Sequence, residues 1–401
     1  MKNESILKLS ILMSTFLIFF GYFVVNQYII LGFIALLIII CSIEIRFIKI
    51  KTDDMLWLIC VGLIGLSLCY SQDKAETVKY FMVMSIMIII KIVYSNIEGY
   101  KDYIIKLFYI SSLIHVMATI AYIIVPNIMI KICSIILPYK SYLDNLQFYN
   151  IGSIAGITGQ TGMNAFYISI YISIIYSRII CSNKNKLYNI VLLIIGFIAL
   201  FLTAKRGPLI TNIIAILVVT VIFSNINIKN LMPKLIAFTV LLIIGYNVIC
   251  RIPQAQVMID KFTIFSESAD ITNGRSELWN EASDYIKVNP IIGIGAYATP
   301  SVMGEMTHNI YVQLVLELGI FGLIFFIGAM IISFILTFKN YYKIKSNKIV
   351  ENTEKVFFSI SVYIQLYFII YGMSGNPLYG ITFLAPYFIS IAISSTLKNK
   401  I

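Results

Sequence analysis

The chain has 401 residues, of which 59% are hydrophobic and only 12% are charged. A soluble domain carries about 25% charged residues, so this composition excludes a protein for which water is the only solvent. The formal net charge of +11 does not indicate nucleic-acid binding. The lysines and arginines lie in short connectors between apolar segments, where they act as signals of membrane topology.

Apolar residues occur in blocks of about 16 to 25, long enough for a helix to cross a hydrocarbon layer about 30 Å thick. Because backbone amides inside lipid need partners within their own segment, these blocks are predicted to be helices. The sequence therefore predicts an all-α integral membrane protein with about 12 transmembrane helices. The predicted spans are 7–25, 28–45, 55–71, 79–95, 103–125, 163–180, 187–203, 208–224, 234–250, 308–337, 356–373 and 377–396.

The basic residues of the connectors predict the orientation of the chain. If the N-terminus is in the cytoplasm, 20 of the 30 lysines and arginines fall on the cytoplasmic side and 10 fall outside. By the positive-inside rule we expect a multi-pass protein of the cell membrane with both termini in the cytoplasm. The first apolar block has no cleavage site after it and is predicted to be a retained span.

Two connectors, 126–162 and 251–307, are too long for simple turns, and both are predicted to be extracytoplasmic loops of a single membrane domain, 1–401. The first loop contains an amphipathic stretch rich in isoleucine. The second loop, between spans 9 and 10, is large and densely charged, and Arg275 to Lys287 has the periodicity of a short helix at the membrane surface. The block at 308–337 is long for one crossing and is expected to tilt or to project from the membrane.

Lys205 and Arg206 lie at the outer end of one apolar block, where the positive-inside rule disfavours cations. Gly207 and Pro208 follow, and proline suits the first turn of a helix, whose free N–H groups favour anions. These residues therefore predict a phosphate or diphosphate site. The alternative is that the two cations extend to anionic lipid headgroups.

The chain contains only two histidines. His308 lies where the acidic outer loop returns to the membrane, and an imidazole at this interface suits a proton acceptor. A histidine held by a backbone carbonyl is the structural alternative. His115 lies in the middle of a predicted span and is expected to form hydrogen bonds between helices.

Three other features have less specific interpretations. Arg275 opens the predicted loop helix, where it is either an anion ligand or an ion-pair partner of the acidic loop. Gly293-Ile-Gly295 lacks the strand of a dinucleotide-binding unit and is predicted to let the backbone turn back toward the membrane. The six cysteines form no CxxC or Cys/His cluster, and the sequence indicates neither a metal site nor a cofactor.

Several short motifs between residues 150 and 330 resemble the O-antigen polymerase and ligase superfamily. They are Gly156-Ile-Thr-Gly-Gln-Thr-Gly-Met-Asn164, Thr203-Ala-Lys-Arg-Gly207, Asn273-Gly-Arg-Ser-Glu-Leu-Trp279, Asn289-Pro-Ile-Ile-Gly-Ile-Gly295, Thr307-His-Asn-Ile-Tyr311 and Glu317-Leu-Gly-Ile-Phe-Gly322. Their order and their placement around the second loop carry the resemblance. Lys205 departs from the family pattern, which usually has a small residue before the arginine.

The resemblance implies a fold related to other lipid-dependent membrane glycosyltransferases. It implies an inverting glycosyl transfer on the outer face of the membrane, from one polyprenyl-diphosphate-linked oligosaccharide to another. Because the sequence shows no metal-ligand cluster and its cations could replace a metal ion, we expect this transfer to be metal-independent. The product would be a capsular, exo- or O-antigen polysaccharide. In this hypothesis His308 is the catalytic base, and Arg206 and Arg275, assisted by Lys205, bind the diphosphate. Lower-ranking substrate-binding candidates from the same motifs are Asn164, Asn309, Tyr311 and Trp279.

The motifs do not separate this polymerase from a ligase that transfers a finished glycan to another acceptor. A flippase for lipid-linked oligosaccharides is a further alternative, although its polar residues should lie deep in both halves of the bundle. A receptor-like or structural membrane protein would not need His308. Besides the lipid-linked glycan and membrane lipid, a chain-length regulator and a flippase are the expected partners, and no nucleic acid is expected.

Overall fold

The computed structural model of the chain describes residues 2–23, 48–97, 99–182, 185–223, 274–345 and 352–395, together with a few single positions between them. Within these ranges the chain forms helices and no β-strand, as predicted. The elements are α1 (Lys2–Phe20), η1 (Gly21–Phe23), α3 (Thr52–Ser67), α4 (Lys74–Asn96), α5 (Lys101–Ile124), α6 (Pro126–Ile136), α7 (Tyr139–Asn150), α8 (Thr161–Cys181), α9 (Lys186–Leu202), α10 (Arg206–Phe223), α13 (Arg275–Val288), α14 (Thr299–Met303), α15 (Ile310–Lys345), α16 (Asn352–Tyr371), η2 (Pro377–Tyr379) and α17 (Ile381–Ser395).

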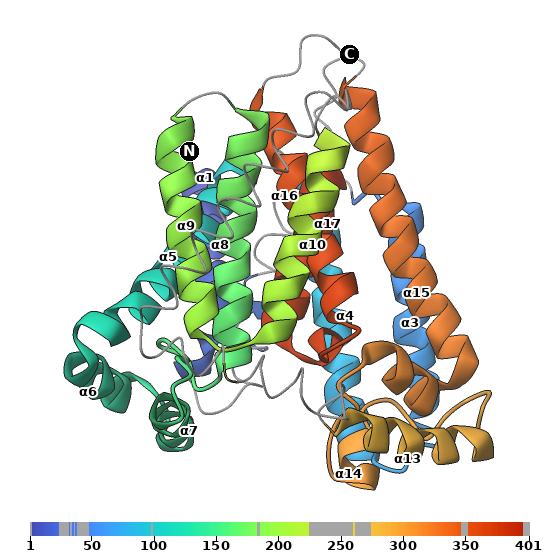
Figure 1. The fold of residues 1–401 in the computed structure, drawn as a ribbon. Coiled ribbons are helices and arrows are strands. Elements are labelled where there is room, and N and C mark those ends of the chain that lie inside the picture. The colour runs from blue at the N-terminus through green and yellow to red at the C-terminus, as the bar shows by residue number, and fades with distance from the viewer. Residues whose placement is uncertain are drawn as a thin grey trace.

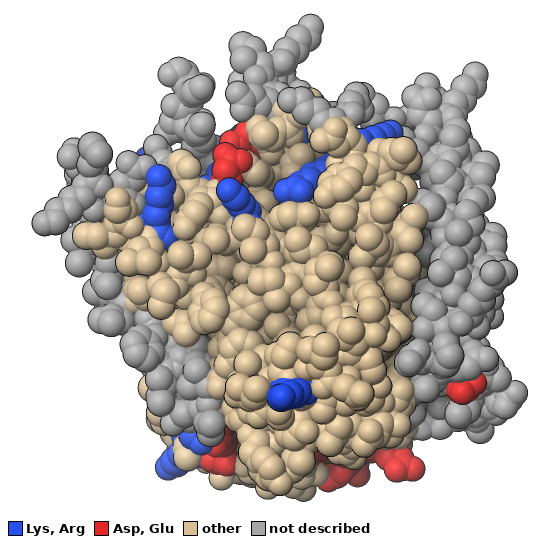
Figure 2. All heavy atoms as spheres, turned by 90° about the vertical axis from the view of Figure 1, so that its left-hand side faces the viewer, with Lys and Arg blue, Asp and Glu red and all other residues tan. Residues whose placement is uncertain are grey.

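Seven helices of the described residues are long and apolar enough to cross a membrane. They are α1 with η1, α4, α5, α8, α10, α15 and α16. Figure 2 shows that, on one face, charged side chains gather toward the two ends of the molecule and leave a mostly uncharged band between them. The chain is therefore a multi-pass membrane protein.

Ten of the twelve predicted spans coincide with helices in the described residues: α1, α3, α4, α5, α8, α9, α10, α15, α16 and α17. The predicted spans at 28–45 and 234–250 lie outside the described residues, apart from a few single positions. The total of about 12 spans therefore stays a prediction.

Four helices, α6, α7, α13 and α14, lie at the lower end of the bundle in Figure 1, which is called the loop end below. The predicted connector 126–162 supplies α6 and α7, and the described part of the connector 251–307 supplies α13 and α14. The amphipathic stretch forms α6, which buries Met129 and Cys133 and exposes Ile128, Ile132 and Ile135. Such a pattern is typical of a helix that lies along a membrane surface.

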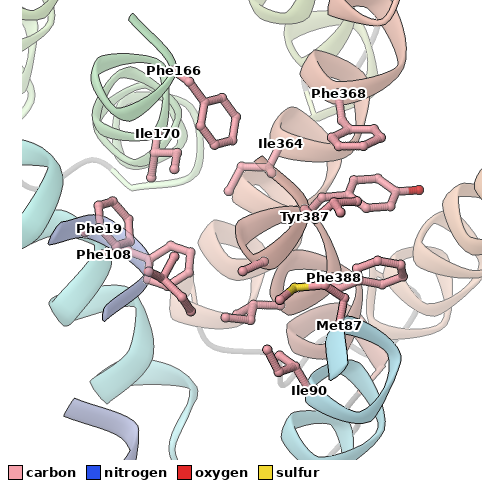
Figure 3. Packing of buried hydrophobic residues seen from close by; sticks show 14 of the residues in the cluster. Phe19, Met87, Ile90, Phe108, Phe166, Ile170, Ile364, Phe368, Tyr387 and Phe388 are labelled. Carbon is pink, nitrogen blue, oxygen red and sulfur yellow. The ribbon is translucent and has the colours of Figure 1, made fainter. Parts of the chain in front are cut away.

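The long helices pack through a core of aromatic and aliphatic side chains (Figure 3). Phe19 of α1 meets Phe108 of α5 edge to face, with ring centroids 5.1 Å apart. Polar pairs add to this packing. The Asn212 amide donates to Ser169 Oγ at 2.7 Å, and the Tyr363 hydroxyl donates to Asn212 Oδ1 at 2.7 Å. Since lipid removes the hydrophobic drive for association, close packing and such hydrogen bonds hold the helices together.

A buried ion cluster ties α3 to α4. Lys91 is fully buried and forms ion pairs with Asp53, at 2.6 Å, and with Asp54. The two aspartates lie in the first turn of α3, where negative charge is favoured by the helix dipole. Removing one partner of such a buried pair leaves an uncompensated charge, so the cluster fixes how these helices pair.

Helix α15 is broken at Gly319, which has a φ of +66°. The backbone of residues 290–295 forms hydrogen bonds with the residues on either side of the break. Ile294 N–H donates to Leu316 O and Gly295 N–H donates to Glu317 O, both at 2.9 Å, while Ile320 N–H donates to Pro290 O at 3.0 Å. Gly293 and Gly295 have positive φ values, so this glycine pair forms the predicted turn. The first part of α15 thus belongs to the loop end, and the part after Gly319 is the crossing segment.

The break predicts a strong asymmetry between two glycines of the same helix. A Cβ atom on Gly319 would overlap the carbonyl group of Ile291, whereas one on Gly328 meets nothing within 4 Å. Gly319→Ala should therefore lower the free energy of unfolding by at least about 2 kcal/mol, from backbone strain and overlap. Gly328→Ala should leave it unchanged or slightly higher. Thermal unfolding in detergent measures both, and equal stability of the two variants would contradict the broken helix.

Candidate functional site

Lys205 and Arg206 are placed by a tight turn between α9 and α10. Helix α9 ends at Leu202, and Ala204 then adopts a left-handed conformation with a φ of +53°. Glycine is usual at this position after a helix, because a Cβ there costs roughly 1–2 kcal/mol. Helix α10 begins at Arg206 and has Pro208 in its first turn, as predicted. Both cations are half-buried at the first turn of this helix.

Arg275 is the first residue of α13, after Gly274, which has a φ of +82°. The helix has the predicted bounds to within one residue, and its predicted apolar face packs on α15 through Ala282, Tyr285 and Ile286. Partial burial lowers the pKa of Arg275, the Tyr371 hydroxyl raises it, and the charge of Arg206 lowers it. Arg275 stays protonated under all ordinary conditions, so the loop end carries a second guanidinium besides that of Arg206.

His308 lies just before α15 and also has a left-handed backbone, with a φ of +53°. His308 is exposed to solvent. Partial burial lowers the pKa of His308, as do the charges of Arg275 and Lys205, whereas Glu305 raises it. The imidazole is therefore neutral at neutral pH, with one ring nitrogen free to accept a proton.

Three segments that are far apart in the sequence come together here. Trp279, one turn after Arg275, donates to Thr307 O next to His308, and Ile310 N–H donates to Gly372 O at the end of α16. Gly207, which follows Arg206, packs against the same end of α16 at Tyr371 and Ser374. The α9–α10 turn, α13 and the turn before α15 therefore meet at the loop end. The four residues Lys205, Arg206, Arg275 and His308 are called the cation–imidazole cluster below.

Tyr371 and Ser374 border this cluster and were not predicted from the sequence. A Cβ atom on Gly207 would lie 2.9 Å from Ser374 Oγ and 3.5 Å from the Tyr371 ring, and one on Gly162 would lie 3.9 Å from the Tyr371 hydroxyl. Tyr371 therefore stands between the first turns of α8 and α10, and it also acts on Arg275. A tyrosine at the end of an apolar block resembles an ordinary interface aromatic, so nothing in the sequence pointed to Tyr371.

The four lower-ranking candidates form hydrogen bonds within the protein. Trp279 Nε1 donates to Thr307 O at 2.9 Å, and Asn309 Oδ1 accepts from Tyr311 N–H at 3.0 Å, which caps α15. The Tyr311 hydroxyl donates to Ile369 O of α16 at 2.7 Å. Asn164 is fully buried and donates to Thr119 Oγ1 at 2.8 Å. The first three hold the His308 turn and its helix in place, while Asn164 belongs to the polar core between α5 and α8.

Glu317 is a further charged residue that the site contains. It is fully buried in the first part of α15. Its carboxylate accepts four hydrogen bonds, from Tyr297 N–H at 2.8 Å, Thr299 Oγ1 at 2.6 Å, Gln313 Nε2 at 2.8 Å and the Tyr379 hydroxyl at 2.8 Å. The sequence indicated only a short motif here, because burial of a carboxylate depends on donors from segments distant in sequence.

The residues at the loop end are suited to bind an anion rather than a metal ion. No group of three or more His, Cys, Asp or Glu side chains gathers anywhere in the part of the chain that the structure describes. Arginine side chains instead offer pairs of N–H groups that match phosphate oxygens. The absence of a metal requirement stays a prediction.

Arg275 should control the charge state of His308, and this can be tested directly. Arg275→Met removes a positive charge that lowers the His308 pKa, so the pKa should rise. With only two histidines in the chain, NMR of histidine-labelled protein in detergent can follow both rings. Lys287→Met is the control, because Lys287 lies on the same helix but pairs with Asp284 at 2.7 Å. An unchanged titration in Arg275→Met would show that the two groups are not neighbours.

Residues 191–327 match the family model described as O-antigen ligase. The matched segment includes the whole cation–imidazole cluster and Glu317, whereas Asn164 and Tyr371 lie outside it. No curated protein matches the sequence.

Proposed function

We propose that this member of the O-antigen polymerase and ligase superfamily is a membrane glycosyltransferase that polymerises lipid-linked oligosaccharides. Its substrates would be oligosaccharide repeat units on a polyprenyl diphosphate, and its product a surface polysaccharide. One observation supports the proposal: the α9–α10 turn with Lys205 and Arg206, the start of α13 with Arg275 and the turn with His308 lie together at one end of the helix bundle. A donor with a diphosphate leaving group and an acceptor with a hydroxyl need this combination.

In the proposed reaction, a sugar hydroxyl of one repeat unit attacks the anomeric carbon of the other. His308 accepts the hydroxyl proton as the new carbon–oxygen bond forms. The bond between the anomeric carbon and the diphosphate oxygen breaks, and polyprenyl diphosphate leaves with the bonding electrons. Attack opposite the leaving group inverts the anomeric configuration. A base in this position contributes about 10²–10⁴-fold to the rate.

The three cations would stabilise the leaving group. Negative charge develops on the diphosphate in the transition state, and preorganised positive groups facing it lower the barrier. Arg206 and Arg275 would each donate two N–H groups to phosphate oxygens, and Lys205 would add a point charge. These fixed charges can take the place of a metal ion, so we expect full activity in the presence of EDTA. A loss of activity in EDTA that a divalent ion restores would contradict metal independence.

The site would face the outside of the cell. The diphosphate of a lipid-linked glycan lies at the depth of the lipid headgroups, and the cluster lies at the loop end, where the long helices stop. The distribution of lysine and arginine favours a cytoplasmic location for both termini. The loop end would then meet substrates on the extracytoplasmic surface of the cell membrane, where flipped lipid-linked repeats, a flippase and a chain-length regulator would be found.

A ligase reaction is the second candidate, and the description of the matched family favours it. The donor, base and diphosphate site would be the same, and only the acceptor would differ. The two reactions can be separated in cells by the pattern of glycan products. Loss of a polymerase leaves single repeat units, whereas loss of a ligase leaves full-length chains that are not attached to their final acceptor.

His308→Ala should abolish chain growth, because the acceptor hydroxyl loses its base. Purified protein with defined lipid-linked repeat units measures this loss, which should be at least about 10²-fold. In the intact protein kcat/KM should rise with pH and level off above the His308 pKa. Partial burial lowers that pKa, as do the charges of Arg275 and Lys205, so activity should be lost on acidification at a lower pH than for an unperturbed histidine. Undiminished growth in the variant would remove His308 from the mechanism.

Arg206→Lys separates bidentate binding from charge. The variant keeps the positive charge but loses the planar pair of N–H donors, so kcat/KM should fall at least about 10-fold. Lys205→Arg is the matched control in the same turn and should keep most of the activity. If both variants were equally active, Arg206 would be a lipid anchor rather than a diphosphate ligand.

A further inference from the structure

The backbone of His308 is held in a strained conformation by its neighbours. A left-handed residue other than glycine costs of order 1–3 kcal/mol and persists only when its surroundings enforce it. Here Thr307 is fully buried, its carbonyl accepts from Trp279 Nε1, and its hydroxyl donates to Asn309 O at 2.9 Å. Asn309 in turn caps α15. The residues on both sides of His308 are thus fixed, while its ring stays accessible.

A chain of buried groups leads from this turn to Glu317. Gln313 Nε2 donates to Glu317 Oε1 and to Met306 Sδ, both at 2.8 Å, and Met306 directly precedes Thr307. A carboxylate oxygen accepts hydrogen bonds, so it holds the NH₂ side of the Gln313 amide toward itself. The amide oxygen is then turned toward Thr307, whose hydroxyl oxygen lies 3.4 Å away. Glu317 therefore helps to orient the amide that packs against the His308 turn.

The same carboxylate holds a second strained residue. Tyr297 has a φ of +59°, and its backbone N–H donates to Glu317 Oε2. Thr299 and Tyr379 donate to the carboxylate as well, so Glu317 joins the loop before α14, the first part of α15 and η2. Burying a carboxylate without a paired cation is costly, and no ion pair of Glu317 occurs among the described residues. Four donors offset that cost and make the carboxylate the centre of the network.

We propose that Glu317 is a positioning residue for the reaction: through Gln313, whose amide contacts Met306 and Thr307, it fixes the backbone turn that presents the His308 imidazole. The inference rests on the proposed function of His308. Glu317 itself is fully buried, so it would act without touching the substrate. A displacement of about 1 Å at a reacting group can cost about 10²-fold in rate, so small changes in this network should be measurable.

Glu317→Gln tests the role. Glutamine fills the same space, but its NH₂ group cannot accept hydrogen bonds and would face some of the four donors. We expect kcat to fall roughly 10- to 100-fold. KM for the lipid-linked donor should stay within about twofold, since the cations are untouched. Ser333→Ala is the control: it removes a buried hydrogen bond from Trp57 Nε1 to the same helix, away from the site. Its kcat should stay near that of the unmodified protein.

Two further measurements make the outcome decisive. The NMR titration of His308 should change in Glu317→Gln and stay unchanged in Ser333→Ala, a difference that general loss of stability would not produce. If Glu317→Gln does not fold, Gln313→Leu removes the amide that joins Glu317 to the turn and should lower kcat in the same way. The positioning role alone would be overturned if His308→Ala were inactive while Glu317→Gln kept full kcat. If Glu317→Gln does not fold, full kcat in Gln313→Leu would have the same meaning. Full activity of His308→Ala would instead overturn the proposed function.

Discussion

The break in α15 at Gly319 is the constraint on which the arrangement of the loop end depends. A continuous helix would use the carbonyls of Leu316 and Glu317 within its own ladder. Here those carbonyls accept the N–H groups of Ile294 and Gly295 instead. These hydrogen bonds join the segment that follows α13 to the start of α15. Arg275 is the first residue of α13 and His308 directly precedes α15, so both lie at the loop end. The site is thus a consequence of how one long apolar block is interrupted.

The gathering of like charges at this surface has an energetic implication. Arg206 lies at the N-terminus of α10, where the helix dipole already contributes partial positive charge, and Arg275 and Lys205 add to it. Like charges repel one another, and a bound multivalent anion would offset that repulsion. Partial burial lowers the pKa of His308, and the charges of Arg275 and Lys205 lower it further, so the imidazolium is disfavoured. One electrostatic feature therefore serves both proposed roles, anion binding and proton acceptance.

Much of the fold could be predicted from the sequence, because hydropathy and helical periodicity are local properties. The helix from Arg275 and the turn at Gly293 and Gly295 formed as predicted. His115 was expected to bond across helices, and its Nε2 lies 3.3 Å from Phe19 O of α1. The fully buried Lys91 with its two aspartates could not be foreseen, since the sequence does not show which connectors meet.

The site itself was only partly accessible to sequence reasoning. The cations and His308 stood out because they are rare residue types in unusual places of an apolar chain. Tyr371 and Glu317 gave weak signals, because their importance comes from neighbours that only the fold supplies. Trp279, Asn309 and Tyr311 were recognised as part of short motifs, and the structure gives them a physical task in holding the His308 turn.

The central claim is that the cation–imidazole cluster binds the diphosphate of a lipid-linked glycan. A cryo-EM structure of the protein in a lipid nanodisc with a polyprenyl diphosphate tests it most directly. The account predicts diphosphate density within hydrogen-bonding distance of Arg206 and Arg275, on the side of the cluster that His308 faces. Density for the diphosphate at another place in the protein, with both arginines turned toward lipid headgroups, would contradict it.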